Sequence, residues 1–446
     1  MDFLIKAAQL ILSLSLLVVL HEFGHFIPAK LFKTRVEKFY LFFNPWFSIF
    51  KKKIGDTEWG IGWLPLGGFV KISGMVDESM DKEQLAKPAQ PWEFRSKPAW
   101  QRLIIMIGGV TVNIITAIVI YAGVVFYYGE EQLKPEDMKS GLAIHPYLNQ
   151  FGLKSGDNII EIDGEKVEKA MDLNNEVMLR GKRNLTVKHA NNSISNINLP
   201  EDIDYQLFEN GAFPAFELRT RNSTIDSLLP DKTALKAGLQ VNDKIIAINE
   251  NPVNFYDDIK SNLYQAKGKQ TSVSILRGLD TISVNLTVPE TGLLGFIVQQ
   301  KSSDFVDFEK VHTAHFGFGE SFSKGIKKGI TTLTDYKAQF KFVFTKKGAT
   351  EVSGFAGIGK LFPSTWNWQL FWLNTAFISI ALAFMNILPI PALDGGHVVF
   401  LIYEMITGRE APQKILEYAQ YVGFVLLIGL TLYVNGLDVF KWLTGS

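Results

Sequence analysis

Two histidines and a glutamate within one short stretch have the spacing of a metal site. They are His21, Glu22 and His25, in the sequence His-Glu-Phe-Gly-His. On a helix, side chains four positions apart share a face, so both imidazoles can reach one ion. Zinc accepts neutral imidazole nitrogens and, in catalytic sites, keeps a position for water. The pattern therefore predicts a Zn²⁺ site in which Glu22 is the general base for attack on a peptide carbonyl.

The surroundings of this motif strengthen the metal interpretation. The motif lies within an apolar stretch from Ala7 to about Leu31, which we interpret as a retained membrane span. Three ionisable residues in a span are costly unless they face the protein interior and have partners. The chain contains no cysteine, so any metal must be held by histidines and carboxylates.

A third ligand is expected from a broken span near the C-terminus. Residues 386–397 read Asn-Ile-Leu-Pro-Ile-Pro-Ala-Leu-Asp-Gly-Gly-His. The prolines cannot continue a regular helix, and the glycine pair permits an unusual backbone path. Irregular backbone at membrane depth is tolerated only where it is buried or lines a cavity. Asp394 is the anionic candidate in this break, and His397 is the lower-ranked rival because the helix is expected to resume around it.

Four stretches are long and apolar enough to cross a hydrocarbon core about 30 Å thick. They cover residues 7–31, 103–128, 366–393 and 418–437. Hydrophobic residues make up 47% of the chain, which fits spans together with a sizeable aqueous portion. The formal net charge is +0 and gives no reason to expect nucleic acid as a partner.

The distribution of basic residues predicts the orientation. Residues 33–102 carry twelve Lys and Arg, including Lys51–Lys53, whereas only Lys6 precedes the first span. The positive-inside rule therefore places this loop in the cytoplasm and the long region between the second and third spans outside. By alternation, the first and third spans end at the same membrane face, which brings Asp394 toward His25.

The outer region contains two similar segments. Sixteen residues from Gly152 and sixteen from Gly238 match at seven positions. Each reads as a turn, an alternating apolar strand and a polar turn. The first segment has the complete GL-x-x-GD-x-I-x-x-I-x-G signature and resembles PDZ domains. The second has Asn242 and Glu250 in place of two glycines, and a chance similarity of unrelated folds is the alternative.

Two further segments adjoin the spans. Residues 36–72 are rich in aromatic and β-branched residues with breaks at Asn44-Pro45 and Gly55-Asp56, which predicts a hairpin-rich sheet near the membrane. Residues 316–342 have apolar residues at near-helical spacing with lysines among them. That pattern fits a helix lying in the membrane interface, and equally an ordinary packing helix.

The predicted fold is a polytopic α-helical membrane protein with four spans, a membrane-associated β-hairpin region and two tandem PDZ-like α+β domains. The expected parts are 1–32 (first span with HEFGH), 33–102 (cytoplasmic β-rich membrane-associated loop), 103–128 (second span), 129–212 and 213–302 (PDZ-like domains 1 and 2), 303–365 (amphipathic interfacial segment), 366–396 (third span with NILPIPALDGG) and 397–446 (fourth span and C-terminus).

Together these motifs resemble the site-2 protease family of intramembrane zinc metalloproteases. The resemblance rests on H-E-x-x-H in a first span and N-x-x-P-x-P-x-LDGG in a later one, and it covers essentially the whole chain. It implies Zn²⁺ held by His21, His25 and Asp394, Glu22 as general base, and Asn386 as a residue that helps hold the substrate backbone. One departure is that residues 109–113, Gly-Val-Thr-Val-Asn, lack the proline of the family's second-span GP-x-x-N.

The resemblance also implies a biological setting. It suggests regulated intramembrane proteolysis in a bacterial inner membrane, with the active site near the cytoplasmic face. The expected substrates are pre-trimmed membrane proteins with single transmembrane segments, of the anti-sigma factor type, and remnant signal peptides. The PDZ-like domains would bind C-terminal peptides or exclude bulky substrates. The alternatives are a PDZ-bearing membrane scaffold with a structural metal site, and an ion transporter.

Overall fold

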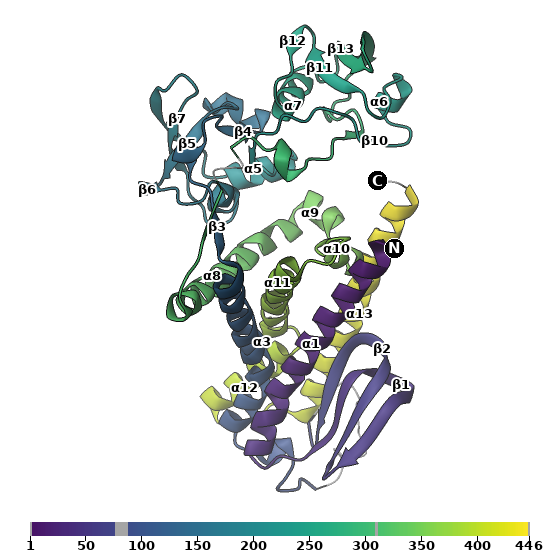
Figure 1. Ribbon diagram of the computed structural model, residues 1–446. Coiled ribbons are helices and arrows are strands. Elements are labelled where there is room, and N and C mark those ends of the chain that lie inside the picture. The colour runs from purple at the N-terminus through teal and green to yellow at the C-terminus, as the bar shows by residue number, and fades with distance from the viewer. Residues whose placement is uncertain (1, 76–87, 308–310, 445–446) are drawn as a thin grey trace. The chain divides into compact units, whose positions relative to one another are not determined.

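A computed structural model describes residues 2–75, 88–307 and 311–444 (Figure 1). The chain forms two compact units. The first, here called the helical unit, comprises Met1–Gly129 and His315–Ser446. The second, here called the inserted unit, is Glu130–Ala314.

Among the described residues, four helices of the helical unit are long and apolar enough to cross a membrane, the number that the sequence predicted. They are α1 (Asp2–Leu31), α3 (Ala99–Tyr128), α11 (Trp368–Ile387) and α13 (Gln413–Thr444). On α13 the apolar side chains of Val425, Leu426 and Leu432 are more than half exposed. Such a surface suits a helix surrounded by hydrocarbon, since its backbone polar groups are satisfied within the helix.

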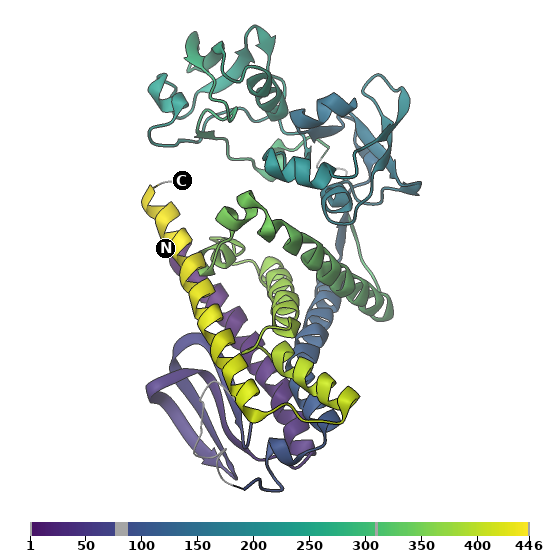
Figure 2. The ribbon, with the colours of Figure 1, turned by 180° about the vertical axis from the view of Figure 1, so that it is seen from behind.

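Helix α3 is the centre of the helical unit, because α1, α11 and a shorter helix, α12 (Asp394–Thr407), all pack against it (Figures 1 and 2). Glycines allow the closest of these approaches. A Cβ added to Gly108 of α3 would lie 2.0 Å from the Gly24 carbonyl oxygen of α1. The two backbones are therefore in contact, as at the small-residue interfaces of membrane helices.

Strands β1 (Val36–Ile54) and β2 (Thr57–Ile72) follow α1 and form the predicted hairpin-rich sheet. The long strands fold back, so that the start of β1 has partners on both sides: Phe39 pairs with Val70 and with Trp59. One of these ladders extends from the pair Val36↔Ile72 to the pair Leu41↔Gly68. Residues 68–72 thus have one strand partner among the described residues and form an edge of the sheet.

The remaining elements of the helical unit lie after the inserted unit. Helix α8 (Phe318–Phe340) packs on α3, where a Cβ on Gly325 would lie 2.7 Å from Ala122 Cβ. It covers the segment for which the sequence predicted an amphipathic helix. The other elements are η1 (Phe94–Ser96), η7 (Lys341–Phe344), α9 (Lys346–Glu351) and α10 (Phe355–Lys360).

The inserted unit contains two four-stranded antiparallel sheets with corresponding strand orders. The first is β6-β5-β7-β8 and the second is β12-β11-β13-β14. Each has a register shift at the same place, between Ile159 and Glu161 in the first sheet and between Ile245 and Ala247 in the second. The strand bounds are Asn158–Ile162, Glu165–Lys166, Asn184–Lys188 and Ile194–Asn198 for β5 to β8, and Lys244–Ile248, Asn251–Pro252, Gln270–Arg277 and Asp280–Thr287 for β11 to β14.

The turns explain how the second sheet tolerates residues other than glycine. Gly156 has φ +98°, and Asn242, which replaces it, has φ +73°. Asparagine enters this left-handed region more readily than most residues. Preceding the central strands, Asp157 and Asp243 are both buried, and each accepts a hydrogen bond from the backbone N–H three residues earlier. These correspondences extend the sequence match to backbone conformation and hydrogen bonding.

Short helices and ladders complete the inserted unit. The second sheet buries an aliphatic core that includes Ile245, Val273 and Ile275. The helices are α4 (Leu173–Met178), α5 (Ile203–Glu209), α6 (Thr233–Lys236) and α7 (Tyr256–Gln265), besides the short 3-10 turns η2 (Pro135–Asp137), η3 (Pro146–Phe151), η4 (Ala170–Asp172) and η5 (Ser302–Asp304). Two-stranded ladders pair β4 (Leu142–Ile144) with β9 (Phe216–Leu218), β10 (Ser227–Leu228) with β15 (Phe296–Ile297), and β3 (Glu130–Gln132) with β16 (His312–Ala314).

Candidate metal centre

Asp394 lies at the end of the non-helical segment that separates α11 from α12. Helix α11 ends at Ile387, and α12 begins at Asp394, so the helix resumes three residues earlier than the sequence suggested. Gly395 permits this early restart, because a Cβ there would lie 2.2 Å from the Leu388 carbonyl oxygen. An ion pair between Arg102 of α3 and Glu404 holds the far end of α12.

The structure brings His21, His25 and Asp394 together. Asp394 Oδ2 lies 3.4 Å from Nε2 of each histidine. The two Nε2 atoms are 3.2 Å apart. Among the described residues, these three are the one group of His, Asp and Glu with metal-site spacing.

This triangle has the dimensions of a zinc site. Zinc bonds of about 2.0–2.1 Å in a tetrahedron place neighbouring ligand atoms roughly 3.3–3.4 Å apart. Asp394 Oδ2 is buried and forms no hydrogen bond. His25 Nδ1 donates to the Ile105 carbonyl oxygen over 2.8 Å, so His25 Nε2 carries a lone pair. A carboxylate oxygen and a nitrogen lone pair facing one another repel unless a cation lies between them, and the residues therefore fit a metal ion.

Helix α3 supplies the floor of the centre. A Cβ on Gly109 would lie 2.4 Å from His25 Nε2 and 2.6 Å from His21 Cε1, so only glycine leaves room for both rings. The side-chain amide nitrogen of Asn113 lies 3.1 Å from His21 Nδ1. The sequence did not predict this contact. The available signals were an amide side chain within an apolar span and its place at the end of the Gly-Val-Thr-Val-Asn segment.

Glu22 lies between the two histidines on α1 and faces β2. Glu22 is 9% exposed, and Val70 of β2 lines the same cavity as its side chain. A Cβ on Gly68 would lie 3.6 Å from Glu22 Cγ, so the edge of the sheet runs close to the carboxylate. Glu22 is outside the three-ligand group, which leaves its carboxylate free to exchange protons.

A cavity of about 480 Å³ opens beside the three ligands. Its lining includes Glu22, Asn386 of α11, His397 of α12 and the edge residues Gly67–Ile72 of β2. His397 is hydrogen-bonded to Gln420 of α13 and is not in the three-ligand group. The cavity therefore brings together a triangle with metal-site spacing, a carboxylate and a strand that forms a sheet edge among the described residues.

Comparison with known proteins places this architecture in a family. The model of peptidase family M50 matches residues 9–430. The chain belongs to peptidase family M50. The predicted family and metalloprotease class are therefore confirmed.

Relatives match this peptidase over nearly their whole length. The regulator of sigma E protease of Haemophilus influenzae is 28% identical, with 97% of this chain and 98% of the relative covered. Protease RseP of Yersinia pestis is 26% identical over 97% of this chain and 98% of its own. A Vibrio cholerae protein named as a zinc metalloprotease is 28% identical, with 96% and 97% covered.

Proposed function

We propose that this peptidase is a zinc-dependent intramembrane endopeptidase whose metal is held by His21, His25 and Asp394. The observation that carries the proposal is the triangle of 3.2, 3.4 and 3.4 Å between the three ligand atoms. His21 and His25 lie on α1, which is apolar enough to span a membrane, and Asp394 begins α12, after the similarly apolar α11. Zinc, when bound there, polarises the scissile carbonyl and acidifies a water molecule. The zinc metalloprotease name of the Vibrio cholerae relative supports the choice of metal.

Glu22 acts as the general base. Its carboxylate accepts a proton from the attacking water and passes it to the leaving amine. Burial on α1 next to both histidines keeps the carboxylate within the centre, and the strand edge at Gly68 packs close to its Cγ. A structural metal site would need no such base, which favours the protease over a PDZ-bearing scaffold with a structural metal.

The edge of β2 presents the substrate in extended form. A transmembrane helix shields its own peptide bonds by hydrogen bonding, so cleavage requires a locally unwound segment. Residues 68–72 have one strand partner and line the cavity, so an unwound segment can add as a further strand beside Glu22. Asn386, on the same cavity wall, is placed to hydrogen-bond the backbone of that segment.

The inserted unit consists of two tandem PDZ-like domains that restrict access to the centre. Corresponding strand orders, register shifts and buried aspartates in the two sheets support two copies of one fold. The unit is inserted between α3 and α8, within the portion that carries the ligands. With residues 33–102 cytoplasmic, the inserted unit lies outside a bacterial inner membrane and screens substrates there.

The substrates are membrane proteins with a single transmembrane segment and little left outside the membrane. The sigma E regulator name of the Haemophilus influenzae relative supports pre-trimmed anti-sigma factors, within regulated intramembrane proteolysis. Remnant signal peptides have the same chemistry, a short apolar helix with a small outer part. C-terminal peptides generated by trimming would be ligands of the PDZ-like domains.

The deciding experiment measures zinc content and cleavage of a single-span substrate in the same purified samples. Glu22→Gln removes the base and leaves all three ligands, so zinc content should match the native chain while cleavage falls by about 10²–10⁴-fold or more. Native-like turnover by Glu22→Gln would refute the general-base role. Stoichiometric zinc without cleavage by the native chain would favour the scaffold.

A further inference from the structure

We propose that Asn113 is a positioning residue of the metal centre. Its side-chain oxygen accepts a hydrogen bond from His21 Nδ1–H and thereby holds the Nε2 lone pair of His21 toward the ion. This inference rests on the proposed function, since it takes His21, His25 and Asp394 as the metal ligands.

The surroundings of Asn113 carry the inference. The residue is fully buried in the apolar helix α3. Its Nδ2 lies 3.1 Å from His21 Nδ1, while its buried Oδ1 has no hydrogen-bond partner among the residues that the structure describes. A buried amide oxygen without a donor is costly. A half-turn of the amide exchanges two groups of nearly the same shape, so that Oδ1 meets the ring nitrogen and becomes satisfied.

The two orientations of the amide have opposite consequences for the metal. If Nδ2 donates to His21 Nδ1, the ring proton must reside on Nε2, where it would point at Asp394 and the other imidazole. If Oδ1 accepts from Nδ1–H, Nε2 carries the lone pair that a metal requires. Only the second orientation gives His21 Nε2 the lone pair that the ligand triangle requires.

His25 shows the same arrangement with a backbone acceptor. Its Nδ1 donates to the Ile105 carbonyl oxygen over 2.8 Å. Ile105, Gly109 and Asn113 follow one another at four-residue intervals and therefore share one face of α3. This face offers an acceptor to each imidazole, and Gly109 leaves the space for both rings. Helix α3 thus selects the tautomer of both histidine ligands although it contributes no ligand itself.

The position of Asn113 is fixed from a third helix. Ser379 of α11 donates its hydroxyl to the Asn113 carbonyl oxygen over 2.7 Å, and Ser379 is itself fully buried. The backbone at Asn113 is therefore tied to α11, while the side chain reaches α1. This assigns a physical role to the second-span Gly-Val-Thr-Val-Asn segment.

Three variants of the full-length chain test the proposal. Asn113→Leu keeps the size of the side chain and removes the acceptor. Asn113→Asp keeps an acceptor and removes the donor. Gln9→Leu is the matched control, because Gln9 is also a fully buried amide in a span with an unpaired oxygen, but it bonds Pro363 rather than a ligand histidine.

The readout is zinc affinity by competition with a chelator, together with the visible spectrum of the Co²⁺-substituted protein in detergent. Asn113→Leu should lower zinc affinity by about 10–100-fold, the usual loss for an outer partner of a ligand. It should also change the Co²⁺ bands. Asn113→Asp and Gln9→Leu should retain native affinity within a factor of a few and keep the native bands.

Two results would overturn the proposal: native zinc affinity in Asn113→Leu, or equal loss in Asn113→Asp and Asn113→Leu. If Asn113→Leu does not fold, Asn113→Asp decides alone, since a native site there supports the acceptor role and a lost site refutes it. Absence of zinc binding by the native chain is a different outcome, because it would refute the proposed function itself.

Discussion

The residues of the proposed metal centre differ in how readily the sequence indicates them. His21 and His25 are one helical turn apart, and this spacing alone predicts a shared metal site. Asp394 lies near the other end of the chain, and only the proline-rich break around it marks it as unusual. Asn113 is marked by its polarity and by its place in the Gly-Val-Thr-Val-Asn segment, but neither signal indicates a contact with His21. At this scale the sequence predicts residues that act in a local motif, and it misses those that act through a neighbouring helix.

The choice between Asp394 and His397 as third ligand gives a direct prediction. Asp394→Ala should lower zinc affinity by more than about 100-fold, because loss of an outer partner alone costs about 10–100-fold. His397→Ala should change it by less than about 10-fold, since His397 bonds Gln420 instead. Zinc titration of both purified variants measures the difference. Equal losses, or the reverse order, would show that the third ligand is wrong.

At the scale of helices and strands, α3 is the element against which the other helices of the metal centre pack. It contacts α1, α11 and α12, and its glycines remove the side chains that would keep α1 away. The sequence predicted the spans because apolar length is a one-dimensional signal. It could not predict which faces touch, since a glycine in a span has the same hydropathy wherever it points. The folding back of β1 and β2 escaped prediction for a similar reason, because strand pairing depends on contacts between distant residues.

Close packing of α1 on α3 gives the second prediction. Gly108→Ala places a Cβ 2.0 Å from the Gly24 carbonyl oxygen, so the helices must separate. We expect a loss of about 1–3 kcal/mol or more in stability, as for overpacked cores, together with weaker zinc binding. Thermal unfolding in detergent and zinc titration measure both effects.

Gly123→Ala is the matched control for this prediction. Gly123 lies on the same helix, and no atom of the described residues lies within 4 Å of its Cβ position, so its replacement should not lower stability and should leave zinc affinity unchanged. If Gly108→Ala behaves like this control, the α1–α3 contact does not hold the centre together.

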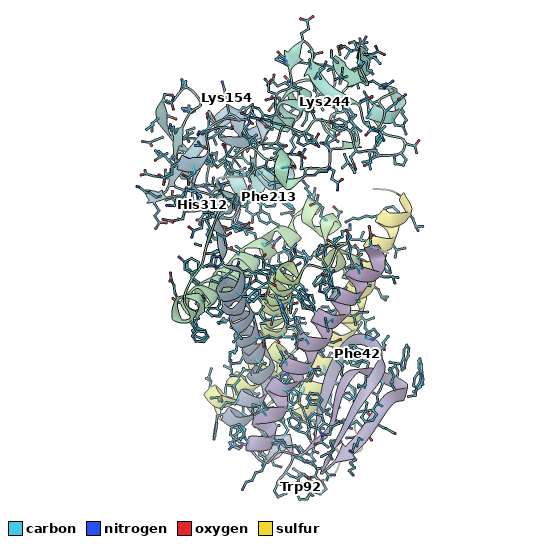
Figure 3. All side chains as sticks on the ribbon, viewed as in Figure 1. Phe42, Trp92, Lys154, Phe213, Lys244 and His312 are labelled. Atoms are coloured by element: carbon cyan, nitrogen blue, oxygen red, sulfur yellow. The ribbon has the colours of Figure 1, made fainter. Side chains whose placement is uncertain are left out.

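At the scale of the whole molecule, orientation is the property that the sequence predicts and chemical labelling can test. Lys51–Lys53 should react poorly with an impermeant amine label added outside intact cells, whereas Lys154 and Lys244 should be labelled. All five lysines are exposed on the protein surface, and the latter two lie in the inserted unit (Figure 3). An outer membrane, if there is one, must first be made permeable. Reversed labelling would place the inserted unit in the cytoplasm and remove its proposed screening role.

Removal of the inserted unit tests that screening role. The β3–β16 ladder pairs Gln132 with His312, so a short flexible linker can replace residues 133–311 at a natural stem. The shortened chain should still cleave a pre-trimmed substrate, and it should also cut one that carries a folded outer domain. Cleavage of matched substrates with and without that domain, at equal zinc content, measures selectivity. A zinc-loaded variant that cuts neither substrate would show that the unit delivers substrate instead.

The wide separation of the ligands along the chain has a consequence for biosynthesis. Ribosomes add about 5–20 residues per second, so tens of seconds pass between synthesis of His25 and of Asp394. During that interval the nascent chain presents two imidazoles and Glu22 without the carboxylate that completes the triangle. If Asp394 is the third ligand, we expect the nascent chain to be inactive while it is inserted beside other unfolded membrane segments. Proteolysis would then begin only after α12 has packed on α3, so the order of translation would delay it until the fold is complete.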